Sequence, residues 1–260
     1  MRKNNLFILT FIAVFVLIAF GFSQSGSAGT QSRYNIHMQY DVSKTVIPDN
    51  VKAEGKARGV IISIAEFTDI RQVDDKKIIG YVRERDDTRV PIFTKNDAAT
   101  MVVANGIREY LKKAGYGVAD KTIQWNLKEE TLPKGSGKVI IGGTIESMEV
   151  TCWTGVFSHD YKANMKLNLV IADAPKGKVL YQGSVTFAYS KTDVSFSEGE
   201  LGRVASIALG EAIEKIFQGK TITEKIKEAV KLRISDHRID FRISLHRMSC
   251  LIACALRMDS

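Results

Sequence analysis

The sequence predicts an α+β protein, with a mixed, mostly antiparallel sheet and helices packed on one face of that sheet. Two kinds of pattern lead to this prediction. Long stretches between residues 139 and 189 alternate apolar and polar side chains, as half-buried antiparallel strands do. Residues 97–114 and 197–216 instead carry apolar side chains at helical spacing. Strands followed by helices, without regular alternation of the two, are typical of helices that cover one side of a sheet.

The first half of the chain predicts short strands around one helix. Residues 59–67 form an apolar, β-branched run without alternation, which indicates a strand covered on both faces. Two short strands are expected within 78–93, joined at the polar pair Asp86 and Asp87. For the helix at 97–114, Thr94 or Asn96 can cap the start and Gly115 can end it; residues 116–120 then predict a short strand.

Three long strands are expected next, as an antiparallel meander with one solvated face. In the first, 138–153, the apolar positions shift by one residue near Ser147, which predicts a β-bulge there. The second, 161–172, alternates throughout and leads into a Pro- and Gly-containing turn. In the third, one side is expected to carry Val179, Tyr181, Val185, Phe187 and Tyr189.

Two helices close the predicted domain. Ser197 and Glu200 form a capping box ahead of an alanine-rich apolar stripe, and small side chains there allow close packing on the sheet. After Gly219, a second box of Thr221 and Glu224 precedes a narrower stripe.

The N-terminus predicts export. Arg2 and Lys3 precede an apolar run over 6–22, and the small residues at 26–28 suit a signal peptidase, so we expect residues 1–28 to be a cleaved signal peptide. The alternative is an uncleaved anchor, although the run is slightly short of the ~20 residues that a bilayer requires. The region lacks the cysteine that lipid attachment would need, since the cysteines are at 152, 250 and 254.

The rest of the chain divides into three predicted segments. Residues 29–56 show little periodicity and are expected to form a flexible N-terminal arm, followed by a single α+β domain over 57–234. Residues 235–260 form an atypical tail, in which arginine replaces lysine and two of the three cysteines occur. Truncation after Ile234 is therefore expected to leave the fold intact.

Composition restricts the function classes. With 45% apolar and 25% charged residues, the chain has the make-up of an ordinary globular protein. The net charge of +8 falls to +6 once Arg2 and Lys3 are removed with the signal. This charge either favours anionic envelope surfaces or only aids solubility. A nucleic-acid partner is not expected, because the chain is exported and has no Arg/aromatic recognition stretch.

The order of elements resembles the YajG-type family of bacterial envelope lipoproteins over about residues 59–217. The resemblance depends on the opening strand with Asp69 and Arg71, on Gly80, and on the D-x-x-x-G-K-V-L-Y stretch at 173–181. It implies a non-enzymatic domain on the periplasmic side of an outer membrane, without an assigned cofactor. The missing lipidation cysteine departs from the family pattern and leaves direct membrane anchoring open.

Two groups of residues suggest chemistry, and we assign catalysis or metal binding to neither. Cys152, His159 and Asp160 could form a thiol site, but the adjacent Asp160 would not orient the imidazole, and Cys152 falls on an apolar strand face. His246, Cys250 and Cys254 would share a helix face, yet the outer two would lie ~12 Å apart, too far for one Zn²⁺. No catalytic, cofactor-binding or metal-binding residue is therefore predicted.

Partner binding is the remaining prediction. The loop around Trp153, Phe157, His159 and Tyr161 gathers aromatic side chains that either bind a partner or cover the end of the sheet. Asp69 and Arg71 are a recognition pair or a loop-fixing ion pair. We expect an exported, non-enzymatic accessory or binding protein of the periplasm or of the periplasmic face of the outer membrane. Its partner would be an envelope protein or a cell-wall polymer. The alternative is an envelope hydrolase or transferase with an unrecognised active site.

Overall fold

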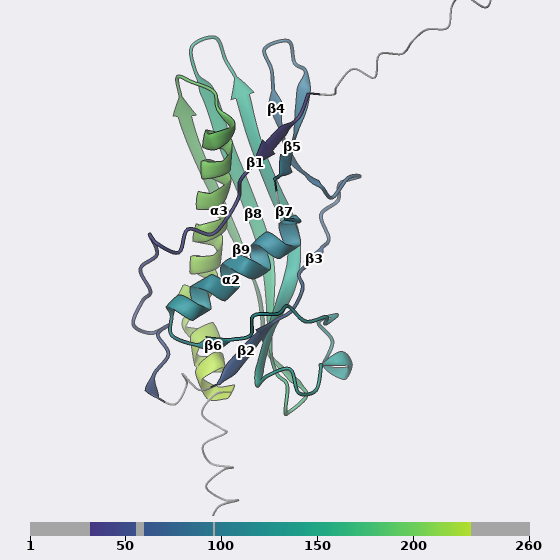
Figure 1. The fold of residues 1–260 in the computed structure, drawn as a ribbon, viewed down its shortest axis with the longest axis vertical. Coiled ribbons are helices and arrows are strands. Elements are labelled where there is room, and N and C mark those ends of the chain that lie inside the picture. The colour runs from purple at the N-terminus through teal and green to yellow at the C-terminus, as the bar shows by residue number, and fades with distance from the viewer. Residues whose placement is uncertain (1–31, 56–59, 96, 230–260) are drawn as a thin grey trace, which may run out of the picture. The chain divides into compact units, whose positions relative to one another are not determined.

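Three long strands form the centre of the fold in the computed structural model, which describes residues 32–55, 60–95 and 97–229 (Figure 1). They are β7 (Val139–Thr154), β8 (His159–Asp173) and β9 (Lys178–Asp193), paired antiparallel in chain order. The predicted bulge is confirmed, because the β7–β8 register shifts between Ile145 and Ser147. The shift turns Met148, Val150 and Cys152 toward the core.

Short strands pair with the other edge of β7, at its two ends. The N-terminal end pairs parallel with β2 (Ile61–Ile64) and β3 (Thr68–Asp69), and β2 pairs with β6 (Gly117–Val118). The C-terminal end pairs parallel with β4 (Ile78–Arg83), which forms an antiparallel hairpin with β5 (Arg89–Thr94). The long ladders are antiparallel and the short ones mostly parallel, so the mixed, mostly antiparallel sheet of an α+β fold is confirmed.

The helices pack against the face of the sheet that carries the main apolar core (Figure 1). They are α2 (Ala99–Lys113) and α3 (Glu198–Gln218), and residues 220–229 are also helical. Ser197 caps α3 as predicted, since its hydroxyl accepts from the Glu200 N–H at 3.0 Å. The Thr94 cap is wrong: α2 starts after Ala98, and the Thr94 hydroxyl donates instead to the Asp97 carbonyl. Asn96 lies outside the described residues.

The opposite face of the sheet is only partly solvated. Exposed side chains of β8 line its middle, but a second small core covers the end that holds the β8–β9 turn. This core contains Ala65, Trp125, Ile140, Val170 and Ala172. Val179 packs here rather than beside Tyr181, which corrects the predicted alternation of the third strand. The cause is a shift in the β8–β9 register between Ile171 and Ala172, where Leu180 is an extra residue in β9. This shift reverses the face of the β9 residues that precede Leu180.

The segment before β2 is also part of the core. β1 (Tyr34–Ile36) pairs parallel with β5, and the chain after it covers the two helices. Six apolar side chains of this segment are buried, namely those of Ile36, Met38, Tyr40, Ile47, Val51 and Ala53. For residues 34–53 the prediction of a flexible arm is therefore wrong. Their apolar residues follow neither helical nor strand periodicity, because most of them pack from an irregular chain onto a surface that already exists.

Several predictions fall on residues that the structure does not describe. These are the signal peptide at 1–28, the tail at 235–260 and the possible metal cluster of His246, Cys250 and Cys254. Within 32–55, 60–95 and 97–229, the longest helices are too short or too polar to cross a membrane.

Candidate binding surface at the hairpin end

Two hairpin turns meet at the end of the sheet where β7 finishes. One is the β7–β8 turn over residues 155–158, and the other is the β4–β5 turn over 84–88 (Figure 1). The Arg85 guanidinium joins them, since its Nε donates to the Gly155 carbonyl at 3.0 Å and its Nη2 to the Val156 carbonyl at 3.3 Å. The sequence places these turns 70 residues apart, so only the parallel pairing of β4 with β7 brings them together.

Four large apolar side chains are exposed at this end. Trp153 and its neighbours Val156 and Phe157 are 56%, 68% and 87% exposed, and Val194, which follows β9, is 83% exposed. Val194 belongs to the same end because β9 finishes beside the start of β8, with Asp193 opposite His159. We call these four residues and the groove described next the hairpin-end surface. A cluster of exposed apolar side chains is less common on a monomer than single ones and marks a contact site.

A groove of about 270 Å³ runs from Trp153 across the solvated face of the sheet. Tyr81 and Trp153 supply aromatic walls, and charged side chains of both signs border them: Arg83, Arg89, Lys162, Glu149 and Asp160. The Arg83 guanidinium lies 4.4 Å from the centre of the Trp153 ring and also pairs with Asp87 at 2.7 Å. This cation–π contact holds the indole in one orientation while much of it stays exposed.

The predicted residues His159 and Tyr161 support the surface from beneath. Tyr161 is fully buried, its hydroxyl donates to the Ser195 carbonyl at 3.0 Å, and it accepts from the Ser197 N–H at 3.1 Å. It therefore positions the loop that carries Val194 and the start of α3. His159 packs at 5.8 Å from the Phe196 ring, and its Nδ1 is buried with no hydrogen-bond partner among the described residues. Of the predicted aromatic residues, only Trp153 and Phe157 are well exposed.

The thiol, imidazole and carboxylate of the possible nucleophilic site do not converge. Cys152 is 1% exposed within the core, and burial raises the pKa of its thiol to about 12, so the reactive thiolate is not formed at neutral pH. Asp160 pairs with Trp153 on the opposite face of the sheet and accepts from the Thr192 hydroxyl at 2.6 Å. Among the described residues, no group of three or more His, Cys, Asp or Glu side chains could hold a metal ion.

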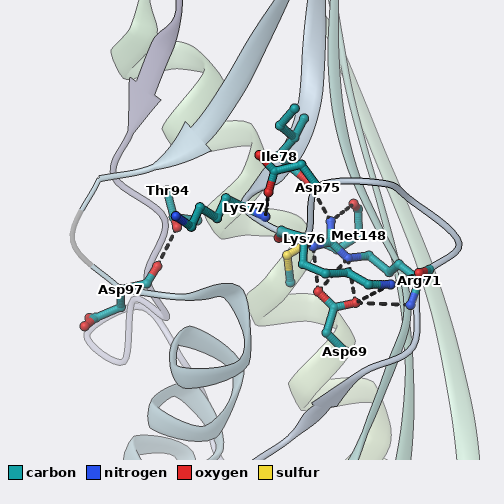
Figure 2. A network of polar contacts seen from close by, with 9 residues as sticks. All are labelled: Asp69, Arg71, Asp75, Lys76, Lys77, Ile78, Thr94, Asp97 and Met148. Carbon is teal, nitrogen blue, oxygen red and sulfur yellow. Dashed lines mark hydrogen bonds and ion pairs between the residues drawn. The ribbon is translucent and has the colours of Figure 1, made fainter.

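Asp69 and Arg71 form an ion pair at the middle of the sheet (Figure 2). Arg71 Nη2 lies 2.7 Å from Asp69 Oδ2, and the Arg71 side chain is 4% exposed. Its remaining donors reach backbone carbonyls: Nη1 those of Ile78 (3.0 Å) and Met148 (3.2 Å), and Nη2 that of Lys76 (2.6 Å). Arg71 thereby ties the loop over 70–77 to β7 immediately after its bulge.

This arrangement leaves the pair no free donor for a partner. Burial acts to raise the pKa of the Asp69 carboxyl, but hydrogen bonds from the Arg71 side chain and backbone outweigh it and hold that pKa below its usual value. Met148 also lies six residues before the end of β7, about 20 Å away along the strand. Asp69 and Arg71 are thus separate from the hairpin-end surface, and their contacts fit the loop-fixing interpretation.

An open groove of about 590 Å³ lies beside this pair, lined by Val73, Asp74, Asp75, Glu146 and Glu149 among others. Its carboxylates are mostly exposed, and Glu146 is already paired with Lys166 at 2.8 Å. The buried lining residue Arg71 already has its donors engaged, so these exposed acidic side chains do not define a ligand site.

Sequence reasoning missed part of the hairpin-end surface. Tyr81, Arg83 and Arg85 come from the β4–β5 hairpin, and Val194 comes from the loop after β9. An available signal was the position of Arg83 and Arg85 beside the predicted turn at Asp86 and Asp87. The sequence could not show that this turn lies beside the β7–β8 turn, because the order of strands in a sheet depends on residues far apart in the chain.

Comparisons with known proteins leave the family open. No protein-family model matches the chain, and no curated protein matches it. Among solved structures, it is similar to protein XCC0632 from Xanthomonas campestris, with 12% identity, coverage of 76% of this chain and 97% of that one, and a TM-score of 0.46. It is also similar to the PelC dodecamer from Paraburkholderia phytofirmans, with 15% identity, coverage of 63% of this chain and 91% of that one, and a TM-score of 0.36. Lipoprotein GNA1162 from Neisseria meningitidis shows 14% identity, coverage of 58% of this chain and 96% of that one, and a TM-score of 0.31.

The similar structures thus include a protein described as a lipoprotein, but likenesses this distant carry no information on function. The resemblance to the YajG-type family stays a prediction.

Proposed function

We propose that the chain is an exported, non-enzymatic protein of the bacterial cell envelope that binds a partner protein through the hairpin-end surface. The observation that carries the proposal is the exposure of Trp153, Val156 and Phe157 beside a groove with charged sides. Trp, Tyr and Arg are the residues most often found to dominate binding energy in protein interfaces, and Trp153, Tyr81 and Arg83 occur here together.

Preorganisation supports the same conclusion. Arg83 holds the indole of Trp153, and Arg85 holds the backbone of the β7–β8 turn. Because these groups are already ordered in the free protein, binding costs less of their conformational entropy. A protein partner fits this surface better than a cell-wall polymer does. The outermost side chains, Val156 and Phe157, are aliphatic or aromatic without a polar atom, and they offer no hydrogen bond to a polar chain.

The proposed location depends on the N-terminal sequence. Arg2 and Lys3 ahead of the apolar run over 6–22 support export, and the missing cysteine near residue 28 argues against lipid attachment to the mature N-terminus. The enzymatic alternative has weaker support, because the one cysteine in the described residues is buried with a raised thiol pKa.

Site-specific photo-crosslinking in intact cells tests the proposal. A photoreactive amino acid would replace Phe157 at the tip and, as the matched control, Lys134, which is exposed in the loop ahead of β7 at the opposite end of the sheet. We expect crosslinks to one protein at position 157 that are absent at 134 and are reduced by Trp153→Ala. Crosslinks to cell-wall fragments instead would indicate a polymer ligand, and equal labelling at both positions would overturn the proposal.

A further inference from the structure

The outer edge of β9 is a second possible interaction site. Among the described residues, β9 pairs only with β8, so one of its two edges has no strand beside it. With 16 residues, this edge is about 50 Å long. An edge strand presents a row of backbone donors and acceptors, and an unprotected edge pairs readily with another strand.

Most devices that normally protect an edge are missing from β9. Over residues 179–190 the sequence VLYQGSVTFAYS contains neither a charged residue nor a proline. On the solvated face the side chains from 184 to 190 are small: Ser184, Thr186, Ala188 and Ser190. The register shift near Leu180 affects only the beginning of the strand. Natural edge strands usually place lysine, proline or a bulge in the middle, where they block a neighbour.

We propose that β9 pairs antiparallel with β9 of a second copy of this chain, across a twofold axis near its centre. Around such an axis each residue faces itself or a close neighbour, so a charge there would repel its own copy. The middle of β9 contains no such charge. The strand is self-complementary in this sense, and the two sheets would join into one continuous sheet.

The ends of β9 suit the same arrangement. Antiparallel pairing brings the Lys178 end of one copy beside the Asp193 end of the other, which places opposite charges in the same region. Lys191 does not oppose this, because Asp193 and Glu200 already neutralise it at 2.6 and 2.7 Å. Because Asp193 is itself paired with Lys191 of its own chain, the ends add little net attraction, but they do not oppose the pairing.

Two side-chain contacts to the β9 backbone limit the paired region. Glu129 accepts from the Val179 N–H at 2.7 Å, and Lys215 of α3 donates to the Thr186 carbonyl at 3.3 Å. The first contact lies at the beginning of the strand. The second lies at its centre, where a lysine that reaches the backbone competes with an incoming strand. Lys215 therefore weakens self-association, and its removal should strengthen it.

Sedimentation equilibrium of the full chain, purified from the envelope fraction of producing cells, tests the proposal. We expect a monomer–dimer equilibrium in the wild-type protein. The double substitution Ser184→Lys and Ala188→Lys places like charges near the axis and should raise the dissociation constant about tenfold. Lys215→Met should lower it.

The matched control is Asn164→Lys with Asn168→Lys on β8. These residues lie directly beside Ala188 and Ser184 in the β8–β9 ladder, so the same two charges enter the same face one strand further from the edge. They should change the dissociation constant much less.

A strictly monomeric wild type, or equal effects of the two double substitutions, would overturn the proposal. Thermal unfolding shows whether the variants fold, and Lys215→Met provides an independent test if they do not. A dimer that survives every edge variant but is lost in Trp153→Ala would assign the contact to the hairpin-end surface instead.

Discussion

At the scale of single residues, Arg71 shows how a buried charge becomes structural. All five N–H donors of its guanidinium are engaged, with Asp69 and with three backbone carbonyls. The carbonyls belong to the loop over 70–77, to β4 and to β7, so one side chain connects three segments. A fully hydrogen-bonded buried cation is tolerated because each donor has an acceptor in place of water.

The first prediction concerns this residue. Arg71→Ala would leave the Asp69 carboxylate with only its longer contact to Lys76, at 3.9 Å, and would leave the three carbonyls without the Arg71 donor. We expect the free energy of unfolding in urea to fall by about 3–5 kcal/mol. Arg71→Lys is the control, since it keeps the charge but cannot form the planar, bidentate contact, and its loss should be intermediate. A loss below about 1 kcal/mol for Arg71→Ala, as for a surface ion pair, would contradict this role.

At the scale of elements, close contact between β4 and β7 depends on Gly80. A Cβ atom at this position would lie 1.7 Å from the Val150 carbonyl oxygen, which no side chain tolerates. The β4–β5 register also shifts beside this glycine, between Ile78 and Gly80. Because the β4–β5 hairpin carries Tyr81, Arg83 and Arg85 to the hairpin end, the glycine indirectly determines where the hairpin-end surface forms.

Gly80→Ala should therefore displace β4 from β7. We expect a loss of several kcal/mol in the free energy of unfolding, within the tail of strongly destabilising substitutions (more than ~4 kcal/mol). Gly199→Ala is the matched control, because the nearest atom to its Cβ would be Ser197 Oγ at 3.9 Å and alanine favours the helix. Urea unfolding of both variants checks this, and equal stability of the two would show that β4 adapts.

At the scale of the whole molecule, the segment over 34–53 completes the core. It joins β1 to the sheet and packs across α2 and α3, where Tyr40 approaches Gly106 and Gly210. The Tyr40 hydroxyl also donates to Glu214 Oε1 at 3.1 Å. The segment thus holds the two helices together in addition to covering them.

A chain that begins at Ala57 should fold poorly compared with one that begins at Gly29. It would lose the buried side chains of Ile36, Met38, Tyr40, Ile47 and Val51. Each such side chain contributes about 1.5–3 kcal/mol, so together they match the ~5–15 kcal/mol stability of a typical domain. Circular dichroism during heating should show a cooperative transition for the longer chain only. Equal thermal midpoints would restore the prediction of a flexible arm.

Local patterns in the sequence were sufficient for most of the elements, though not for β1 and β3, and for part of the site. Alternation predicted β7, β8 and β9, and the one-residue shift near Ser147 predicted the bulge, because each side chain of a strand must face either the core or solvent. The aromatic residues around the β7–β8 turn marked Trp153 and Phe157 as candidates, and both are exposed.

Only the tertiary structure decided which segments meet. The parallel pairing of β4 with β7 brought Arg83 and Arg85 to the hairpin end. Tyr161 is buried beneath that end by the loop before α3, and Asp69 and Arg71 lie apart from it, beside the bulge of β7. The burial of residues 34–53 was likewise invisible in their irregular pattern. The physical reason is the same in each case: periodicity reports the surroundings of one element, whereas strand order and the packing of irregular chain depend on partners distant in the sequence.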